Sequence, residues 1–342
     1  MKSLFKSLVF FILLFLCFSN LVSAQKSLQD IAELNDKKWD KLVKNYRNNS
    51  TWIDQLQGLL NEDLLAEENL PDPKGIGVLT MQVWDKSETV VSQSTFEGMY
   101  SSTTTTTYSK NFLSPSGSNI VADKFIETML PIYGDQFKTK GISLIEPQEF
   151  LTDEEKRTIY KEGVYAIEVS GLVKSLLSIN TFLTGKDKEV QSSLSASGYE
   201  FYPVSASIMS SDFKSPASLG LIVEDLGLDA VLILTVNVSL VRNGKSLVLH
   251  GLEAGIVGPI DDDQSKEYKG RIGAGMMNMY RDGLSFSTTY FDVEPFEIAK
   301  INKSNGAIEE WYLEGLDVVT ERMATDLIRG MEKFIALDKS KD

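Results

Sequence analysis

Two residue types that carry much enzyme chemistry are almost missing: the 342 residues include one cysteine, Cys17, and one histidine, His250. Cys17 lies in an N-terminal segment that we expect to be removed. The mature chain would then have no disulfide, no thiolate nucleophile and no cysteine metal ligand. Residues 25–342 are long enough to bury a core without disulfides. The lack of cysteine suits a bacterial envelope protein better than an animal extracellular one.

Basic residues are also scarce, with 34 Lys and Arg against 48 Asp and Glu and a formal charge of −14. Removal of Lys2 and Lys6 would take this charge to −16. Such a charge repels nucleic acid phosphates and anionic lipid head groups, so we expect no nucleic-acid partner. It would suit a basic partner or a cationic ligand, although solubility alone accounts for it.

The first 24 residues have the three parts of a signal peptide. Lys2 and Lys6 give a positive start, residues 8–16 are an unbroken apolar run, and Val22-Ser23-Ala24 supplies small residues for cleavage before Gln25. We therefore predict export to the periplasm or the cell surface, where outer-membrane association is an option.

Two alternatives to cleavage before Gln25 are a retained membrane anchor and a lipoprotein attached through Cys17. The apolar run is shorter than the roughly 20 residues of a bilayer span. Phe15 and Leu16 are bulky, whereas lipoprotein sites usually have small residues before the cysteine. We therefore expect no transmembrane segment after signal cleavage.

Residues 25–70 are predicted to form an N-terminal helical segment. Its apolar residues fall roughly on one stripe, interrupted by a polar break at residues 48–50. Pro71 and Pro73 end the segment. The segment could cover its own domain, which is the default for an amphipathic helix, or offer its apolar face to a partner.

Residues 71–342 are predicted to form one mixed α/β domain, with antiparallel hairpins packed by amphipathic helices. Residues 101–107 would be an exposed edge strand or a loop. A helix capped by Ser116 or Ser118 should be kinked or split by Pro131. Asn243-Gly244 and Asp282-Gly283 are predicted hairpin turns. We predict strands at 76–84, 142–145, 229–241, 246–256, 268–279 and 284–293, and helices at 118–140, from 152, at 164–183, 215–226 and 308–335.

No residue pattern in the chain identifies a reaction centre. His250 stands inside a predicted strand, and no Gly-x-Ser-x-Gly elbow provides it with a nucleophile, so we interpret it as structural. Ser211 and Lys214 match a Ser-x-x-Lys pattern, but its companion motifs are missing and Pro216 follows closely.

Two further clusters are also better explained as structure. Residues 261–263 are three aspartates ahead of Glu267, without the internal glycine of a calcium loop. Gly273-Ala274-Gly275 precedes Met276, Met277 and Met279 but is not followed by the helix and lysine of a phosphate loop. We therefore predict no catalytic, cofactor-binding or metal-ligating residue and no cofactor.

The element order resembles the α/β domain shared by curli secretion channel lipoproteins, penicillin-binding-protein activator lipoproteins and the N-terminal domain of the Tol translocation protein. The matching features are the strand at 75–84, the helix at 118–140, the strand at 142–146 and the run Leu226-Gly-Leu-Asp-Ala-Val-Leu-Ile233. The resemblance is architectural and carries over no site residue. It implies an envelope protein that binds other envelope proteins without catalysis.

Two functions of different class follow from these observations. The first is an exported, non-catalytic cell-envelope protein that acts as an interaction or assembly module; it predicts apolar patches and edge strands. The second is a secreted hydrolase or small-ligand-binding protein whose site the sequence does not reveal; it predicts a cleft with converging acids near His250 and residues 261–263.

We expect the exported protein to begin at Gln25 and to carry no lipid, because the small residues at 22–24 fit cleavage better than the bulky flank of Cys17. Intact mass measurement or N-terminal sequencing of the exported protein checks this. A mature chain that begins with a diacylated Cys17 would contradict it.

Overall fold

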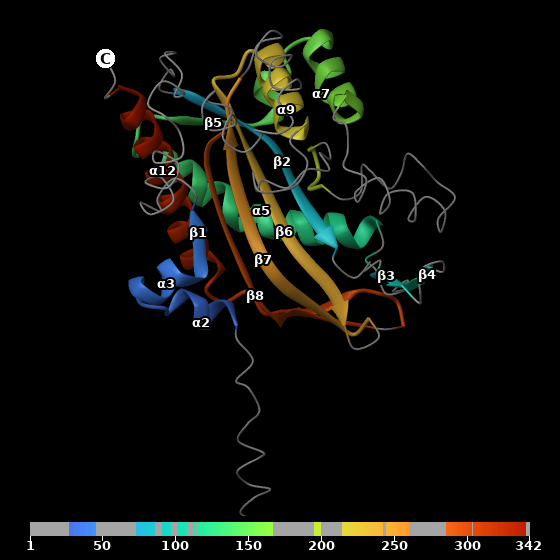
Figure 1. The fold of residues 1–342 in the computed structure, drawn as a ribbon. Coiled ribbons are helices and arrows are strands. Elements are labelled where there is room, and N and C mark those ends of the chain that lie inside the picture. The colour runs from blue at the N-terminus through green and yellow to red at the C-terminus, as the bar shows by residue number, and fades with distance from the viewer. Residues whose placement is uncertain are drawn as a thin grey trace, which may run out of the picture.

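A mixed β-sheet forms the centre of the fold, and its strands are β1 (Val43–Asn45), β2 (Gly75–Asp85), β5 (Ser143–Ile145), β6 (Ala230–Val241), β7 (Ser246–Val257), β8 (Ser285–Ile301) and β9 (Ile308–Trp311). The strand order is β1-β8-β7-β6-β2-β5, and β9 pairs with β8 off this path (Figure 1). β2 is parallel to β5 and β6, whereas the other pairs are antiparallel. The mixed α/β class predicted from the sequence is confirmed.

The computed structural model describes residues 27–45, 73–85, 91–96, 102–107, 113, 115–166, 195–199, 214–241, 244–259, 285–302 and 304–339. None of the helices in these ranges is both long and apolar enough to cross a membrane. The predicted signal peptide lies outside them, as do most of the predicted helix at 164–183 and the whole predicted strand at 268–279.

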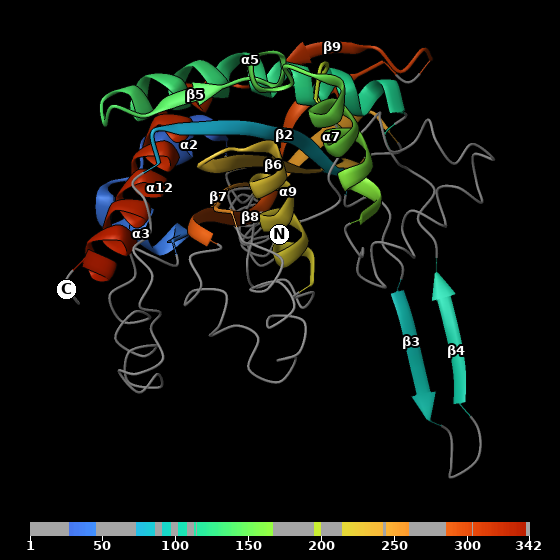
Figure 2. The same cartoon turned by 90° about the horizontal axis from the view of Figure 1, so that it is seen from above.

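Helices cover both faces of this sheet, and they are α2 (Leu28–Ala32), α3 (Asp36–Leu42), α5 (Pro115–Lys138), α6 (Pro147–Phe150), α7 (Glu154–Ala166), α9 (Lys214–Leu226) and α12 (Leu316–Lys339). Figure 2 shows α5, α12 and α2 on one side of the sheet and α9 on the other. Outside the main sheet, β3 (Val91–Phe96) and β4 (Ser102–Thr107) form an antiparallel pair, so most of the predicted edge strand or loop at 101–107 is a strand.

The predicted helix at 118–140 exists as α5, but its predicted start was wrong, and it is not split. α5 begins at Pro115, where the ring fits the first turn of a helix. Ser116 and Ser118 therefore lie inside the helix and cannot cap it. Pro131 does not split α5, whose 24 residues run without a break from Pro115 to Lys138. Ile120, placed on the predicted apolar stripe, is 53% exposed.

The sequence pattern of β6 follows from burial on both faces of the sheet. Leu232, Leu234 and Val236 point into the main core shared with α5 and α12. Val231 and Ile233 are buried on the opposite side, where α9 packs. Farther along that side Thr235, Asn237 and Ser239 replace the apolar residues. The strand therefore starts as a continuous apolar run and becomes an alternation.

The hairpin predicted between β6 and β7 is confirmed. The two strands pair antiparallel up to Val241 and Ser246, and Gly244 has the positive φ of +80° that the turn requires. The next predicted strand, at 284–293, is longer in the structure. β8 continues to Ile301 through an irregularity between Asp292 and Phe296, and this interval contains Pro295. Proline lacks an N–H, so it is tolerated at such an irregular place in a strand.

The predicted helix at 308–335 was wrong in its first turn. Residues 308–311 form β9 on the edge of β8, and α12 begins at Leu316. Apolar residues at 308 and 311 fit a helical spacing, but the chain reverses at Gly315, whose φ is +86°. A Cβ at Gly315 would lie 2.9 Å from the Cα of Gln29, so α2 and the start of α12 are in close contact.

The N-terminal segment also differs from the prediction of a helix over residues 26–70. Residues 27–45 form two short helices and then β1, which pairs with β8. Leu28, Ile31, Trp39 and Val43 belong to the main core. This part of the segment therefore covers its own sheet, the default role that we expected for it. Residues 46–72 lie outside the described ranges.

A buried polar contact ties α3 to α12. The indole Nε1 of Trp39 donates to Asp326 Oδ2 at 2.7 Å, and Arg322 lies 4.3 Å from the centre of the indole ring. Burial raises the pKa of Asp326, against the lowering effects of the Trp39 hydrogen bond and of the Arg329 charge. Burial also raises the pKa of the nearby Tyr133 hydroxyl, and the negative charge of Asp326 adds to the effect.

We expect Asp326→Asn to stabilise the protein at neutral pH. Because the pKa of Asp326 is raised on folding, its contribution to stability is fully present below the ordinary aspartate pKa of about 4 and is lost as the pH rises through the folded value. Asparagine keeps an acceptor for Trp39 and does not ionise. The advantage of the variant in urea unfolding should therefore grow from about pH 4 upward.

Asp326→Leu is the matched control, because it removes both the charge and the acceptor. Relative to Asp326→Asn, it leaves the Trp39 N–H buried without this acceptor and should cost about 1–3 kcal/mol of unfolding free energy at every pH. A difference between Asp326→Asn and the wild type that does not change with pH would contradict the prediction.

Candidate functional site

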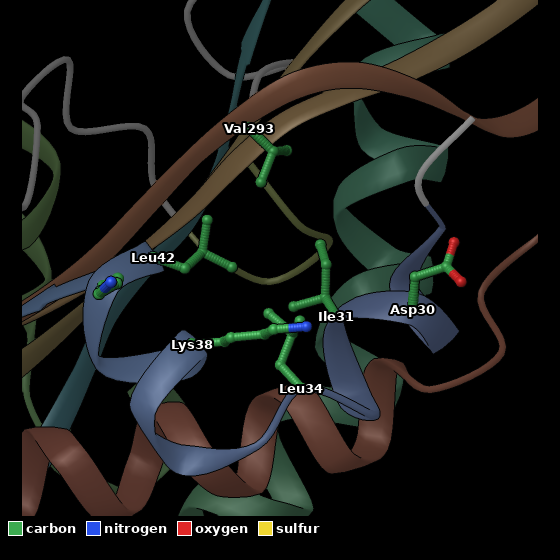
Figure 3. Close-up of a pocket in the computed structure, with 7 residues that line it drawn as sticks. Asp30, Ile31, Leu34, Lys38, Leu42 and Val293 are labelled. Atoms are coloured by element: carbon green, nitrogen blue, oxygen red, sulfur yellow. The ribbon is translucent and has the colours of Figure 1, made fainter. Parts of the chain in front are cut away.

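A pocket of about 430 Å³ opens between the two N-terminal helices and β8 (Figure 3). Its apolar lining consists of Ile31, Leu34, Leu42 and Val293, and its charged lining consists of Asp30, Lys38 and Lys41. In Figure 3 the side chains of Ile31, Leu42 and Val293 point toward one another across the pocket. The volume lies in the range of small-ligand sites, about 300–1,000 Å³.

Local capping and one arginine hold the two helices that form the pocket. Ser27 and Asp30 form a capping box at the start of α2, and Asn35 accepts from the N–H of Lys38 at the start of α3. Arg322 of α12 donates to the carbonyl oxygen of Leu34 in the connection between the helices. It also pairs with Asp36 at 3.1 Å. The pocket wall is therefore fixed from outside by α12.

The three charged residues at the pocket differ in whether they have a polar partner. Asp30 accepts from the backbone N–H and the hydroxyl of Ser27 at 2.8 and 2.9 Å. Lys38 and Lys41 make no ion pair with any residue that the structure describes. Both lysines are exposed, and they lie three residues apart on α3. The pocket therefore combines an apolar floor with two available ammonium groups.

A second candidate site is the polar part of the sheet face opposite α5 and α12. Side-chain hydrogen bonds join neighbouring strands in three places, over distances of 3.0, 2.9 and 2.8 Å: Gln82 to Thr235, Asn237 to Glu253, and Ser246 to Glu297. The hydroxyl and amide side chains in these pairs are 0–3% exposed. Because each donates to or accepts from its neighbour, the row stabilises the sheet.

His250 lies on the same face, at a bulge of β7. Its Nε2 is 2.7 Å from the hydroxyl of Ser239 on β6. A serine within hydrogen-bond distance of a histidine is the first half of a nucleophile–base pair. Ser239 is only 7% exposed, however, so its hydroxyl is largely closed to a substrate. The contact fits the structural role expected for His250.

The bulge at His250 depends on the neighbouring glycine. Asn237 pairs with Gly251 and Val238 with Leu249, so His250 is the extra residue. A Cβ at Gly251 would lie 2.0 Å from the carbonyl oxygen of Phe291 on β8. Only glycine permits this close approach of β7 and β8. Gly251 therefore allows β7 to keep the bulge in which His250 contacts Ser239.

Sequence reasoning missed both Ser239 and the pocket. The Asn243-Gly244 turn was predicted, and counting back from it would have placed Ser239 near His250. The pocket had no comparable signal, because Val293 is far from α2 and α3 in the sequence. The candidates at 211–213, 261–263, 267 and 273–279 lie outside the described residues, and Lys214 is the first residue of α9.

Within the described ranges no group of three or more His, Cys, Asp or Glu side chains could hold a metal ion. No protein-family model, curated protein or solved structure matches the chain.

We expect Gly251→Ala to destabilise the protein by about 2 kcal/mol or more, since the new methyl group must displace the β8 backbone. Gly134→Ala is the control. Gly134 lies inside α5 with open space around its Cβ position, so alanine there should stabilise the protein by about 0.5–1 kcal/mol. Thermal or urea unfolding distinguishes them, and equal effects would show that β8 can shift freely.

If His250 is structural, His250→Gln should lower the unfolding free energy by at most about 1–2 kcal/mol. A double-mutant cycle with Ser239→Ala should give a coupling of about 0.5–1.5 kcal/mol, the net value of one hydrogen bond. Urea unfolding of the four proteins measures it. A folded His250→Gln protein that loses an activity or an interaction of the wild type would show that His250 belongs to a site.

Proposed function

We propose that the chain is an exported, non-catalytic cell-envelope protein that acts as an interaction or assembly module for other envelope proteins. The surface that meets them is the α2–α3 corner, defined here as residues 27–42 together with Val293. The export part of the proposal rests on the residue pattern of positions 1–24. The resemblance to envelope α/β domains supports the same role and remains an expectation.

The observation that carries the proposal is the gathering of apolar side chains at this corner. Among the described residues, Ile120 and Val318 are the exposed large hydrophobic side chains, at 53% and 40%, and they stand singly on α5 and α12, whereas Ile31 at the corner is buried and Leu34, Leu42 and Val293 are half-buried. Single exposed apolar residues are ordinary on protein surfaces. Ile31, Leu34, Leu42 and Val293 instead surround one pocket. A lined apolar depression is where binding energy concentrates in interfaces.

The corner is also preorganised. Trp39 fixes α3 to α12 through Asp326, and Arg322 holds the α2–α3 connection through Leu34. A surface that is already ordered loses little conformational freedom when a partner binds, which favours affinity. The inner side of the corner belongs to the core, and its outer side carries the pocket.

A secreted hydrolase is the second candidate, because the structure brings Ser239 within 2.7 Å of His250. This reading requires the buried hydroxyl to become accessible. Hydrolysis of simple esters by the purified protein, lost in Ser239→Ala, would favour it over the interaction module.

Site-specific photo-crosslinking in living cells tests the interaction module. With a photoreactive residue in place of Lys41, on the rim of the pocket, we expect discrete adducts with envelope proteins. The matched control replaces Lys161, an exposed lysine of α7 on the other side of the sheet. A second change, Leu34→Asp, should remove the adducts because it charges the apolar lining. Equal adducts from positions 41 and 161, or adducts that survive Leu34→Asp, would contradict the proposal.

A further inference from the structure

We propose that the pocket of the α2–α3 corner binds a single-chain anionic amphiphile. The aliphatic chain would lie on Ile31, Leu34, Leu42 and Val293, and the anionic head would meet Lys38 and Lys41. The inference rests on the proposed function in one respect, namely that this corner is a binding surface. The aliphatic chain would then fill the depression and complete the apolar surface that protein partners meet at this corner.

The lining defines the body of the ligand. Seven residues surround the pocket, four of them apolar and three charged, and no neutral polar side chain is among them. A ligand with polar groups along its length would have to desolvate them without partners from these side chains, which is costly. An aliphatic chain has no such groups. A peptide is disfavoured for the same reason, because every residue adds an amide N–H and C=O.

The two lysines define the head group. Lys38 and Lys41 are three residues apart on α3 and therefore lie on the same side of the helix. Neither is engaged in an ion pair with a described residue. Asp30, the opposing charge, is held by Ser27 in the capping box. In Figure 3 it stands beyond Ile31, on the side away from Leu42. The lining residues together therefore carry a formal charge of one positive unit, from two lysines and one aspartate.

The negative charge of the whole chain makes the head-group preference a stringent test. With a formal charge of −14, nonspecific attraction would favour a cationic amphiphile. A preference for an anion can arise only where local lysines outweigh this field. Dodecanoate, dodecyltrimethylammonium and dodecyl maltoside share a chain and differ in head group, so titrations below micelle-forming concentrations separate the two effects.

We expect saturable binding of dodecanoate to the purified protein, tighter than that of the other two probes. Methyl resonances of Ile31, Leu34, Leu42 and Val293 should shift in nuclear magnetic resonance spectra. The double variant Lys38→Gln, Lys41→Gln should bind dodecanoate about tenfold more weakly, since two exposed ion pairs contribute modestly. Lys37→Gln is the control, because Lys37 is an exposed neighbour on α3 outside the pocket lining and should leave binding unchanged.

Several outcomes would overturn the inference. They are absence of saturable binding, equal or tighter binding of the cationic probe, methyl shifts away from the pocket, and unchanged binding in the double lysine variant. Protein adducts from position 41 in cells, without dodecanoate binding, would overturn this inference and leave the proposed function standing. Dodecanoate binding at the pocket without protein adducts would support the inference and remove the interaction module.

Discussion

Burial of the central strands on both faces is the constraint from which the rest of the structure follows. The residues of β6 from Ala230 to Val238 are almost completely buried. Cover is therefore needed on both sides, and α5 with α12 supplies it on one, while α9 covers part of the other. Where the second face turns polar, hydrogen bonds between strands replace apolar packing. The edge of this sheet then provides the attachment for β1 and the α2–α3 corner.

Most of the sheet could be predicted, because the relevant signals are local. The apolar run and the Asn243-Gly244 turn were enough to predict β6 and β7. Pro216 near its start and Gly227 after its end were enough to predict α9. The errors occurred where tertiary contacts override local pattern. Residues 308–311 have a helical spacing of apolar residues, yet they pair with the edge of β8 and form β9. Residues 43–45 looked like the middle of a helix but pair with β8 for the same reason.

The candidate site could not be predicted, because its parts are joined only by the fold. Ile31 and Leu42 read as core residues in the sequence, and Val293 as a strand residue. Their common pocket appears only when β8 passes beneath α2 and α3. Lys38 and Lys41 are ordinary exposed lysines in sequence. What distinguishes them is that both line the apolar pocket, in an otherwise acidic chain.

The hydrogen bond between Trp39 and Asp326 joins residues 287 positions apart. Contacts of such long range form late, because the intervening chain must first be closed into a loop. A ribosome or a translocation channel that releases the chain from its N-terminus presents α2 and α3 first and α12 last. The corner that we regard as the binding surface can therefore be assembled only when nearly the whole sequence has emerged. The proposed binding surface would therefore form only after Asp326 has emerged, and a chain that stops before α12 would lack the contact that holds it.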